Sequence, residues 1–264
     1  MFTKDDHTFA VCAYGESPYL EQCLYSLREQ ELHTNVIIST STPNDAIRRL
    51  AKRYKAPLFI NEGEPGIGHD WNCAISHCQT PLVTIAHQDD IYLPAYAKIM
   101  LSMMNEEEKP LIWFSDYGEL RGDVPCDDSR LLAIKRLLLN PLKRVSSRQS
   151  VFVRRRALSL GSSICCPAVT YCRPNLPDPV FLENMKCDLD WQAWERFSRL
   201  EGSYIYAPQV LMRHRIHEGS ETTALIKDDT RTKEDLVMLR KFWPAPIARF
   251  INGFYSKSQA SNQG

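Results

Sequence analysis

Four short apolar runs, each followed by a segment with helical periodicity, constrain the fold of this chain most strongly. The runs are rich in β-branched residues, as buried strands are. They cover residues 8–14, 35–39, 57–60 and 82–86. A fifth run, 111–115, follows the fourth helical segment. This alternation predicts an α/β fold with a Rossmann-like, mostly parallel central sheet and helices on both faces.

Composition narrows the class of protein. The chain has 264 residues, enough for one large α/β domain or two small ones. Its formal net charge of zero gives no global electrostatic reason to expect a nucleic-acid partner. No apolar run approaches the roughly 20 residues of a membrane span, and the first residues lack the apolar core of a signal peptide. Nine cysteines without a Cys-x-x-Cys pair then lead us to expect free thiols and a cytoplasmic location.

Two adjacent carboxylates, Asp89 and Asp90, follow the apolar run 82–86, and Pro94 then begins a helix. In open α/β sheets, ligands bind beyond the carboxyl ends of the strands. Neighbouring carboxylates repel each other unless a cation lies beside them, and Mg²⁺ is commonly held by one or two carboxylates plus phosphate oxygens. The pair therefore indicates a divalent-cation site, with a solvated turn and helix cap as the other interpretation.

Three further segments carry chemistry. Gly66 and Gly68 precede a helix, where glycine lets a phosphate approach backbone N–H groups, although without further context a plain tight turn is the favoured interpretation. Asp188 and Asp190 open a later helix, and capping explains one of these carboxylates better than both. Two arginines and two histidines within residues 213–217 favour a ligand-contacting role.

The second half of the chain is less regular. Its proline-rich segment 166–179 predicts a wrapping loop, and segments 204–207 and 209–212 predict edge strands. Three aromatic side chains fit either stacking on a ligand or core packing. They are Tyr171, Trp191 and Trp194.

In this order the segments resemble the family-two glycosyltransferases, which have the GT-A fold, over roughly residues 8–220. Residues 9–15 and 66–72 are similar to the family's opening strand and its glycine-to-Asn segment. Residues 87–94 are similar to the Asp-Gln-Asp-Asp-x-Trp-x-Pro form of the metal motif, frequent in rhamnosyltransferase-like members. Residues 188–191 resemble the catalytic-base motif, and residues 215–220 resemble the Arg-x-His-x-x-Ser segment that closes over the donor.

The resemblance implies a metal-dependent, inverting glycosyltransferase with a nucleotide-diphosphate sugar, of UDP or dTDP type, as donor. It implies that Asp90, Asp89 and His217 hold Mg²⁺ or Mn²⁺, and that Asp190, or else Asp188, is the catalytic base. It places the following residues at the nucleotide sugar: Ala13, Tyr14, Glu16, Ser41, Gly68, Asn72, Asp89 and Arg215.

Three departures from the family pattern are visible. His87 replaces the first Asp of the metal motif, and residues 39–42 stand where an Asp pair usually reads the uracil base. The absence of a Gln-x-x-Arg-Trp motif argues against a processive polysaccharide synthase. Two other classes remain open: a non-catalytic GT-A-like module that scaffolds a partner glycosyltransferase, and a sugar nucleotidyltransferase.

The expected organisation is a glycosyltransferase domain over residues 1–220, with a nucleotide-sugar half of about 1–118 and an acceptor half of about 119–220. Residues 221–264 are expected to form a helical extension and tail. The acceptor is expected to be a glycan, a lipid-linked saccharide or a glycoprotein, and no nucleic acid is expected. Segment 242–255, aromatic with scattered cations, fits either a peripheral contact with the inner face of the membrane or packing onto the domain. The sequence leaves the oligomeric state open.

Overall fold

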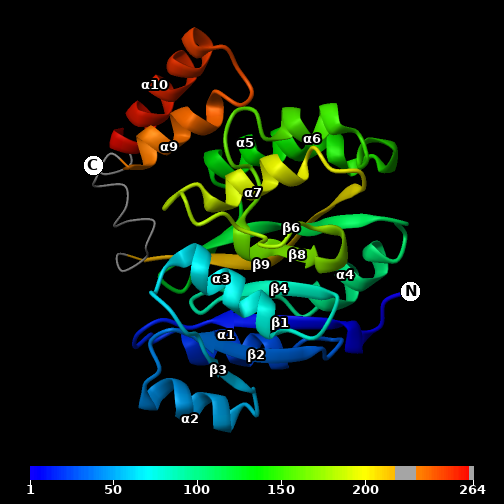
Figure 1. The fold of residues 1–264 in the computed structure, drawn as a ribbon, viewed down its shortest axis with the longest axis vertical. Helices are drawn as coiled ribbons and strands as arrows, with labels where there is room; N and C mark the ends of the chain where they lie inside the picture. The colour runs from blue at the N-terminus through cyan, green and yellow to red at the C-terminus, as the bar shows by residue number, and fades with distance from the viewer. Residues whose placement is uncertain (218–229, 262–264) are drawn as a thin grey trace.

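The structure, a computed structural model, describes residues 1–217 and 230–261, with side chains up to residue 253. Within this part of the chain, nine strands form one sheet in the order β3-β2-β1-β4-β8-β6-β9-β5, and β7 pairs with β6 (Figure 1). The strands are β1 (His7–Cys12), β2 (Asn35–Thr40), β3 (Leu58–Ile60), β4 (Leu82–His87), β5 (Ile91–Tyr92), β6 (Pro110–Arg121), β7 (Val124–Cys126), β8 (Val169–Cys172) and β9 (Ser203–Ile216). Strands β1, β2, β3, β4, β6 and β9 run in one direction, which confirms the mostly parallel α/β sheet.

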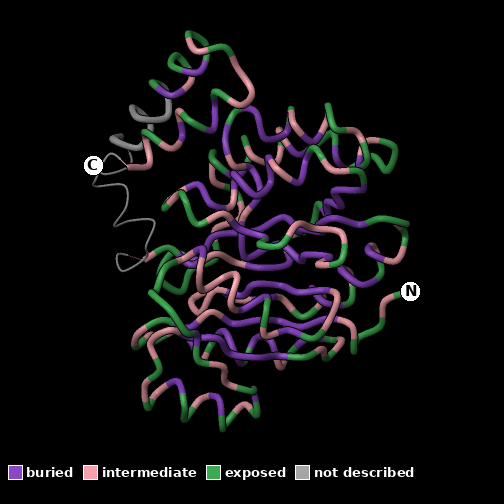
Figure 2. Tube along the Cα trace, in the orientation of Figure 1, coloured by how far each residue is buried: buried purple, intermediate pink, exposed green. Residues whose placement is uncertain are grey.

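Helices cover both faces of the sheet, as expected. The helices are α1 (Leu20–Arg28), α2 (Asp45–Arg53), α3 (Ile67–His77), α4 (Tyr96–Met104), α5 (Arg130–Leu139), α6 (Val151–Ala157), α7 (Leu189–Phe197), α9 (Thr230–Leu239) and α10 (Ala245–Ser261). Side chains of β1 alternate between two cores: Phe9 and Val11 face α1, α2 and α4, while Ala10 faces α3, α6, α7 and α9. The strands between them are buried along most of their length (Figure 2).

Five short 3-10 helices complete the described part of the fold. They are η1 (Lys4–Asp6), η2 (Asn140–Lys143), η3 (Val145–Ser147), η4 (Cys166–Ala168) and η5 (Arg173–Asn175). Figure 1 shows α5, α6 and α7 gathered beside β6 and β9, at the end of the molecule opposite α2.

The expectation of a wrapping loop over residues 166–179 is wrong. This segment contains β8, which lies between β4 and β6 and runs antiparallel to both. Its prolines, Pro167 and Pro174, flank the strand instead of interrupting it, so the ladder of hydrogen bonds survives. Inside the sheet, the hydroxyls of Thr84 and Thr170 lie 2.6 Å apart.

The expectation of two edge strands over 204–207 and 209–212 is also wrong. They are one long strand, β9, between β6 and β5. The register of β9 against β6 shifts where Ser115 and Asp116 pair with Ala207 and Val210. This β-bulge absorbs Pro208 and lets the strand continue toward the metal motif.

Strands from both proposed halves share this one sheet, since β8 and β9 pair with β4 and β6. Beyond residue 229 the chain forms α9 and α10, while 218–229 and 262–264 lie outside the described residues. Phe242 and Trp243 pack onto the domain: the Trp243 indole N–H donates to the Ser159 carbonyl at 2.7 Å, and Arg156 lies over its ring at 4.5 Å. Tyr171, Trp191 and Trp194 are likewise buried in the core. Among the described helices, none is long and apolar enough to span a bilayer.

Candidate active site

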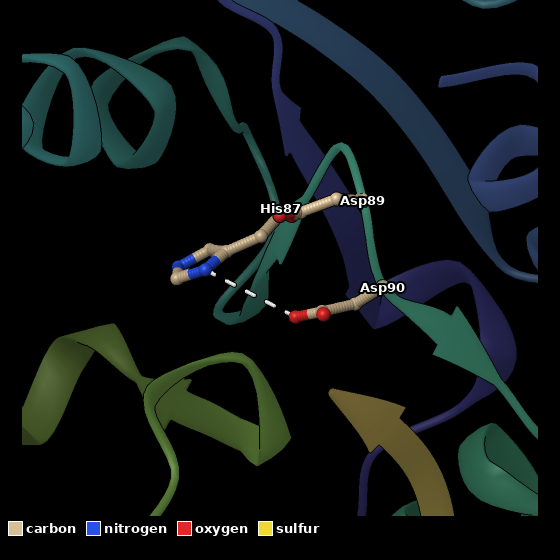
Figure 3. A group of neighbouring side chains, drawn as sticks. All are labelled: His87, Asp89 and Asp90. Carbon is tan, nitrogen blue, oxygen red and sulfur yellow. Dashed lines mark ion pairs between the residues drawn. The ribbon is translucent and has the colours of Figure 1, made fainter. Parts of the chain in front are cut away.

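The metal motif lies at the carboxyl end of β4, where the chain turns toward β5. His87 is the last residue of β4, and Asp89 and Asp90 follow in the turn. Each of the three side chains offers one ligand atom, and these atoms lie within 4.8 Å of one another (Figure 3). The His87 Nδ1 atom is 4.0 Å from Asp90 Oδ2. The strand end therefore brings together the two predicted carboxylates and a histidine.

Asp90 is fully buried, and only one of its carboxylate oxygens is bound by the protein. Its Oδ1 accepts hydrogen bonds from the Arg215 backbone N–H at 2.9 Å and from the His214 ring at 3.0 Å. Its Oδ2 has no hydrogen-bond partner in the described part of the chain, and neither has His87 Nε2. A buried charged oxygen without a partner is unfavourable. The unpaired Asp90 oxygen and the neighbouring His87 ring fit a divalent cation.

His87 is the member of this group to which the sequence reasoning gave no metal role. Its ring stacks on Trp71, with ring centroids 5.4 Å apart. Burial lowers the pKa of His87, although the charges of Asp90 and Asp89 oppose this. The ring is therefore neutral near pH 7 and keeps a lone pair that can bind a metal. The sequence feature that could have indicated a metal-binding role for His87 is its position just before two carboxylates, Asp89 and Asp90.

His217, a predicted metal ligand, lies against Asp89. Its Nε2 is 2.9 Å from Asp89 Oδ2. Burial would raise the pKa of Asp89, but its interactions with His87 and His217 outweigh burial and lower it. Asp89 is consequently ionised at neutral pH, and His217 orients it.

Arg215, predicted to contact the nucleotide, is buried and bonded to the protein. Its Nε donates to the Asp89 carbonyl at 3.0 Å, and its Nη2 donates to Gln22 Oε1 at 2.7 Å. Its Nη1 donates to the Gly122 carbonyl at 3.0 Å, and its guanidinium lies 4.3 Å from the centre of the Tyr19 ring. The structure thus places Arg215 as a link between β9, α1 and the metal-motif turn.

The two candidate bases stand at the start of α7. Asp190 Oδ1 accepts a hydrogen bond from the Trp191 N–H at 2.6 Å, and Ser162 Oγ lies 3.4 Å from its Oδ2. Burial raises the pKa of Asp190, while the Trp191 N–H and the Lys135 charge oppose the rise. This carboxylate is more basic than an ordinary aspartate.

Asp188 is buried more completely, and its Oδ2 has no hydrogen-bond partner among the described residues. Burial, together with Asp235 and Asp190, raises the pKa of Asp188 to about 9. Asp235 comes from α9, which no sequence pattern connected to this site. Glu234, also from α9, accepts hydrogen bonds from the backbone N–H groups of residues 186–188 at 2.8–3.1 Å. Helix α9 thus contributes two acidic side chains to the surroundings of the start of α7.

Residues between the two acidic groups connect them electrostatically. The Lys135 Nζ of α5 donates to the Tyr117 hydroxyl at 2.9 Å. Burial raises the pKa of the Cys165 thiol; Lys135 opposes this, while Asp90 and Asp190 both add to it. The charges of Asp90 and Asp190 therefore act on the same thiol, that of Cys165.

The loop after β1 lies beside the metal motif. The Tyr14 N–H donates to Gln88 Oε1 at 3.0 Å, and Gln88 Nε2 donates to the Tyr14 carbonyl at 2.9 Å. Ala13 is buried and bonds to the Ser39 carbonyl, whereas Glu16 is exposed. Three of the predicted nucleotide contacts therefore stand on one loop at the site.

The other predicted contacts bind protein groups. Ser41 Oγ donates to Asp70 at 3.1 Å, and Asn61 donates to the second oxygen of this carboxylate at 2.9 Å. Asn72 bonds to both backbone groups of Phe181, at 2.9 and 3.0 Å.

Gly68 has a packing reason as well. A Cβ there would meet Leu189 at 3.3 Å, so glycine lets α3 approach the start of α7 closely.

Comparison with known proteins agrees with this fold. The sequence profile described as "Glycosyl transferase family 2" matches residues 8–162. No curated protein sequence matches the chain. Solved structures share the fold at low identity. The fragment of S. aureus TarS that comprises its residues 1–349, in complex with UDP-GlcNAc, has a TM-score of 0.64 at 14% identity, covering 94% of this chain and 70% of that fragment.

Two further structures are similar. The mannosyltransferase PcManGT from Pyrobaculum calidifontis, in complex with GDP-Man and Mn²⁺, has a TM-score of 0.64 at 15% identity, covering 97% of this chain and 73% of the other. Glucosyl-3-phosphoglycerate synthase from Mycobacterium tuberculosis, in complex with Mn²⁺ and UDP-glucose, has a TM-score of 0.60 at 16% identity, covering 90% and 79%. The profile spans more than half of the chain, so this protein belongs to glycosyl transferase family 2.

Proposed function

We propose that this protein transfers a sugar from a nucleotide-diphosphate donor to an acceptor hydroxyl, with a divalent cation and with inversion at the sugar carbon. The observation that carries the proposal is the unpaired, buried Oδ2 of Asp90 beside a neutral His87 and an ionised Asp89. A purely structural turn has no use for a buried carboxylate oxygen without a donor.

Asp89, Asp90 and His87 would hold the cation, with His217 and His214 orienting the two carboxylates from behind. When bound, the cation supplies charge stabilisation to the departing diphosphate. An imidazole nitrogen in the ligand set favours a transition-metal ion such as Mn²⁺ over Mg²⁺, which prefers oxygen.

Asp190 would take the proton from the acceptor hydroxyl. A hydroxyl is a weak nucleophile, and a positioned carboxylate with a raised pKa is a better base for it. A single displacement from the face opposite the leaving group inverts the sugar. Asp188, the second candidate, shares its surroundings with Asp235, which suits it to orient α7 instead.

The solved complexes of the similar proteins contain UDP-GlcNAc, UDP-glucose or GDP-Man. We infer a UDP or dTDP sugar as donor, contacted by the loop of Ala13, Tyr14 and Glu16. The acceptor is a glycan, a lipid-linked saccharide or a glycoprotein, used in the cytoplasm. Because Phe242 and Trp243 pack onto the domain, these two residues of segment 242–255 offer less free aromatic surface for a membrane than the sequence suggested.

Thermal denaturation with a panel of nucleoside diphosphates, with and without Mn²⁺, tests the proposal. A ligand that binds only the folded state raises the Tm. We expect one nucleotide to raise the Tm of the wild type in the presence of Mn²⁺, and Asp90→Asn to lose the rise. Asp128→Asn, at an exposed carboxylate, is the matched control and should keep it. A wild type that responds to no nucleotide would favour the non-catalytic scaffold.

A further inference from the structure

The stretch from residue 129 to residue 177 contains ten arginines and lysines and no aspartate or glutamate. The whole chain has 32 basic and 32 acidic residues, so this imbalance is local. The stretch begins with α5, η2, η3 and α6. An acid-free run of this length concentrates positive charge on one part of the molecule.

Seven of these basic side chains bind other protein groups. They are Lys135, Arg136, Arg148, Arg154, Arg155, Arg156 and Arg173. The other three, Arg130, Lys143 and Arg144, are exposed, and within the described residues they form no ion pair. Three cations on α5, η2 and the following residue therefore face solvent without a protein counter-charge.

Apolar side chains are exposed among these cations. Helix α5 buries Leu132 and Leu139, yet on its other side it exposes Leu131, Ile134 and Leu137, of which Leu137 is 72% accessible. A helix that is apolar on both sides normally has a partner on both sides. The described chain covers one side only.

The neighbouring elements repeat this pattern. Val145 of η3 is 63% accessible, and Phe152 of α6 is 73% accessible. Helix α5 contacts both α6 and η2, so these elements form one region of the molecule; Figure 1 shows α5 and α6 in the half away from α2. We call this region the α5–α6 surface; it comprises Arg130, Leu131, Ile134, Leu137, Lys143, Arg144, Val145, Val151 and Phe152.

We propose that the α5–α6 surface binds an anionic membrane. Apolar side chains interleaved with arginine and lysine match the boundary of a bilayer, where the former enter the acyl region and the latter meet lipid phosphates. A nucleic acid would match the cations but leave the exposed leucines and phenylalanine unburied. The proposal does not rest on the proposed function, because membrane binding is measured without donor, acceptor or cation.

Co-flotation with vesicles tests this. We expect the wild-type protein to float with vesicles of phosphatidylcholine mixed with phosphatidylglycerol, and not with phosphatidylcholine alone. High salt should weaken the binding because it screens the lipid charge. The double variant Lys143→Glu/Arg144→Glu should bind the anionic vesicles at least about tenfold more weakly. Phe152→Ser should weaken binding several-fold, because it removes an inserted apolar group.

Matched variants lie at the other end of the molecule. Arg48→Glu/Arg49→Glu reverses two exposed charges on α2, and Tyr25→Ser removes an exposed aromatic ring, 56% accessible, from α1. Both should bind vesicles as the wild type does. Absence of binding by the wild type, or equal losses in both sets, would overturn the proposal. A further contradicting result would be a wild type that does not bind vesicles but forms a dimer in sedimentation, with the dimer lost in Phe152→Ser. The α5–α6 surface would then bind a second copy of the chain.

Discussion

The two pairs of aspartates differ in their surroundings. At the β4–β5 turn, histidines and an arginine contact Asp89 and Asp90. At the start of α7, burial and another acid act on Asp188 and Asp190. Three groups of β9 and its end, namely His214, Arg215 and His217, bond to the two aspartates of the turn. At the start of α7, the charged group with the largest effect on the pKa of Asp188 is instead another acid, Asp235.

The pKa shifts follow this difference. Interactions with His87 and His217 lower the pKa of Asp89 in spite of burial, while burial raises the pKa of both Asp188 and Asp190. Carboxylates whose pKa values are pushed in opposite directions are suited to different tasks. The Asp89–Asp90 turn fits cation binding, and Asp190 fits proton transfer.

The strongest way to break this comparison is Asp90→Asn. Asparagine keeps an oxygen for the Arg215 N–H but removes the negative charge from the unpaired position. We expect kcat with Mn²⁺ to fall roughly a thousandfold. Steady-state turnover of the nucleotide sugar measures the effect. A loss of less than threefold would mean that the cation binds elsewhere.

Asp190→Asn tests the acidic pair at the start of α7. We expect kcat to fall at least about a hundredfold, with the Kd of the donor unchanged, because only the proton acceptor is lost. Calorimetric titration of the donor separates the two quantities. Ser162→Ala is the control, since it removes only a 3.4 Å contact to the same carboxylate. Weaker donor binding in Asp190→Asn would argue that this residue contacts the donor.

Arg215→Met separates support from ligand contact. Removing a buried guanidinium with several hydrogen bonds should destabilise the fold by about 2–3 kcal/mol, with little change in donor Kd at a temperature where the variant is folded. Urea unfolding measures this. Arg213→Met should lose less than about 1 kcal/mol, because its partner Asp127 is half-exposed. A tenfold weaker donor Kd at unchanged stability would restore Arg215 to the nucleotide.

The sequence predicted the sheet and the acidic motifs because they depend on local patterns. Apolar runs, helical spacing and an Asp pair after a strand are all visible within about ten residues. Strand β8 escaped this reasoning because its four residues stand between prolines, and only pairing with β4 and β6 makes them a strand.

In the candidate active site, too, only contacts between residues close in sequence were predictable. Asp89 and Asp90 are adjacent in sequence, so their association was predictable. Asp235 reaches Asp188 from 47 residues further along the chain, and the bonds that hold Arg215 come from α1 and from the residues before β7. Contacts of this kind follow from the packing of helices, which no local pattern encodes.

The smallest effect we expect is a pH dependence of stability from Asp188. Its pKa is about 9 in the folded protein and 3.8 as an ordinary aspartate. At pH values between these two, Asp188 and Asp235 share a proton in the folded chain. The unfolded chain has already released this proton. Stability from this group is therefore full below pH 4 and falls as the pH rises toward 9. Asp188→Asn removes the titration.

Melting curves from pH 5 to pH 9 measure this difference. We expect the Tm of the wild type to fall more steeply with pH than that of Asp188→Asn, and the variant to melt about 3 °C higher at pH 8. Asp45→Asn, at an exposed position of α2, should follow the wild-type slope. Parallel curves for the wild type and Asp188→Asn would show that Asp188 is ionised in the folded protein, and the contrast between the two acidic ends would then rest on Asp190 alone.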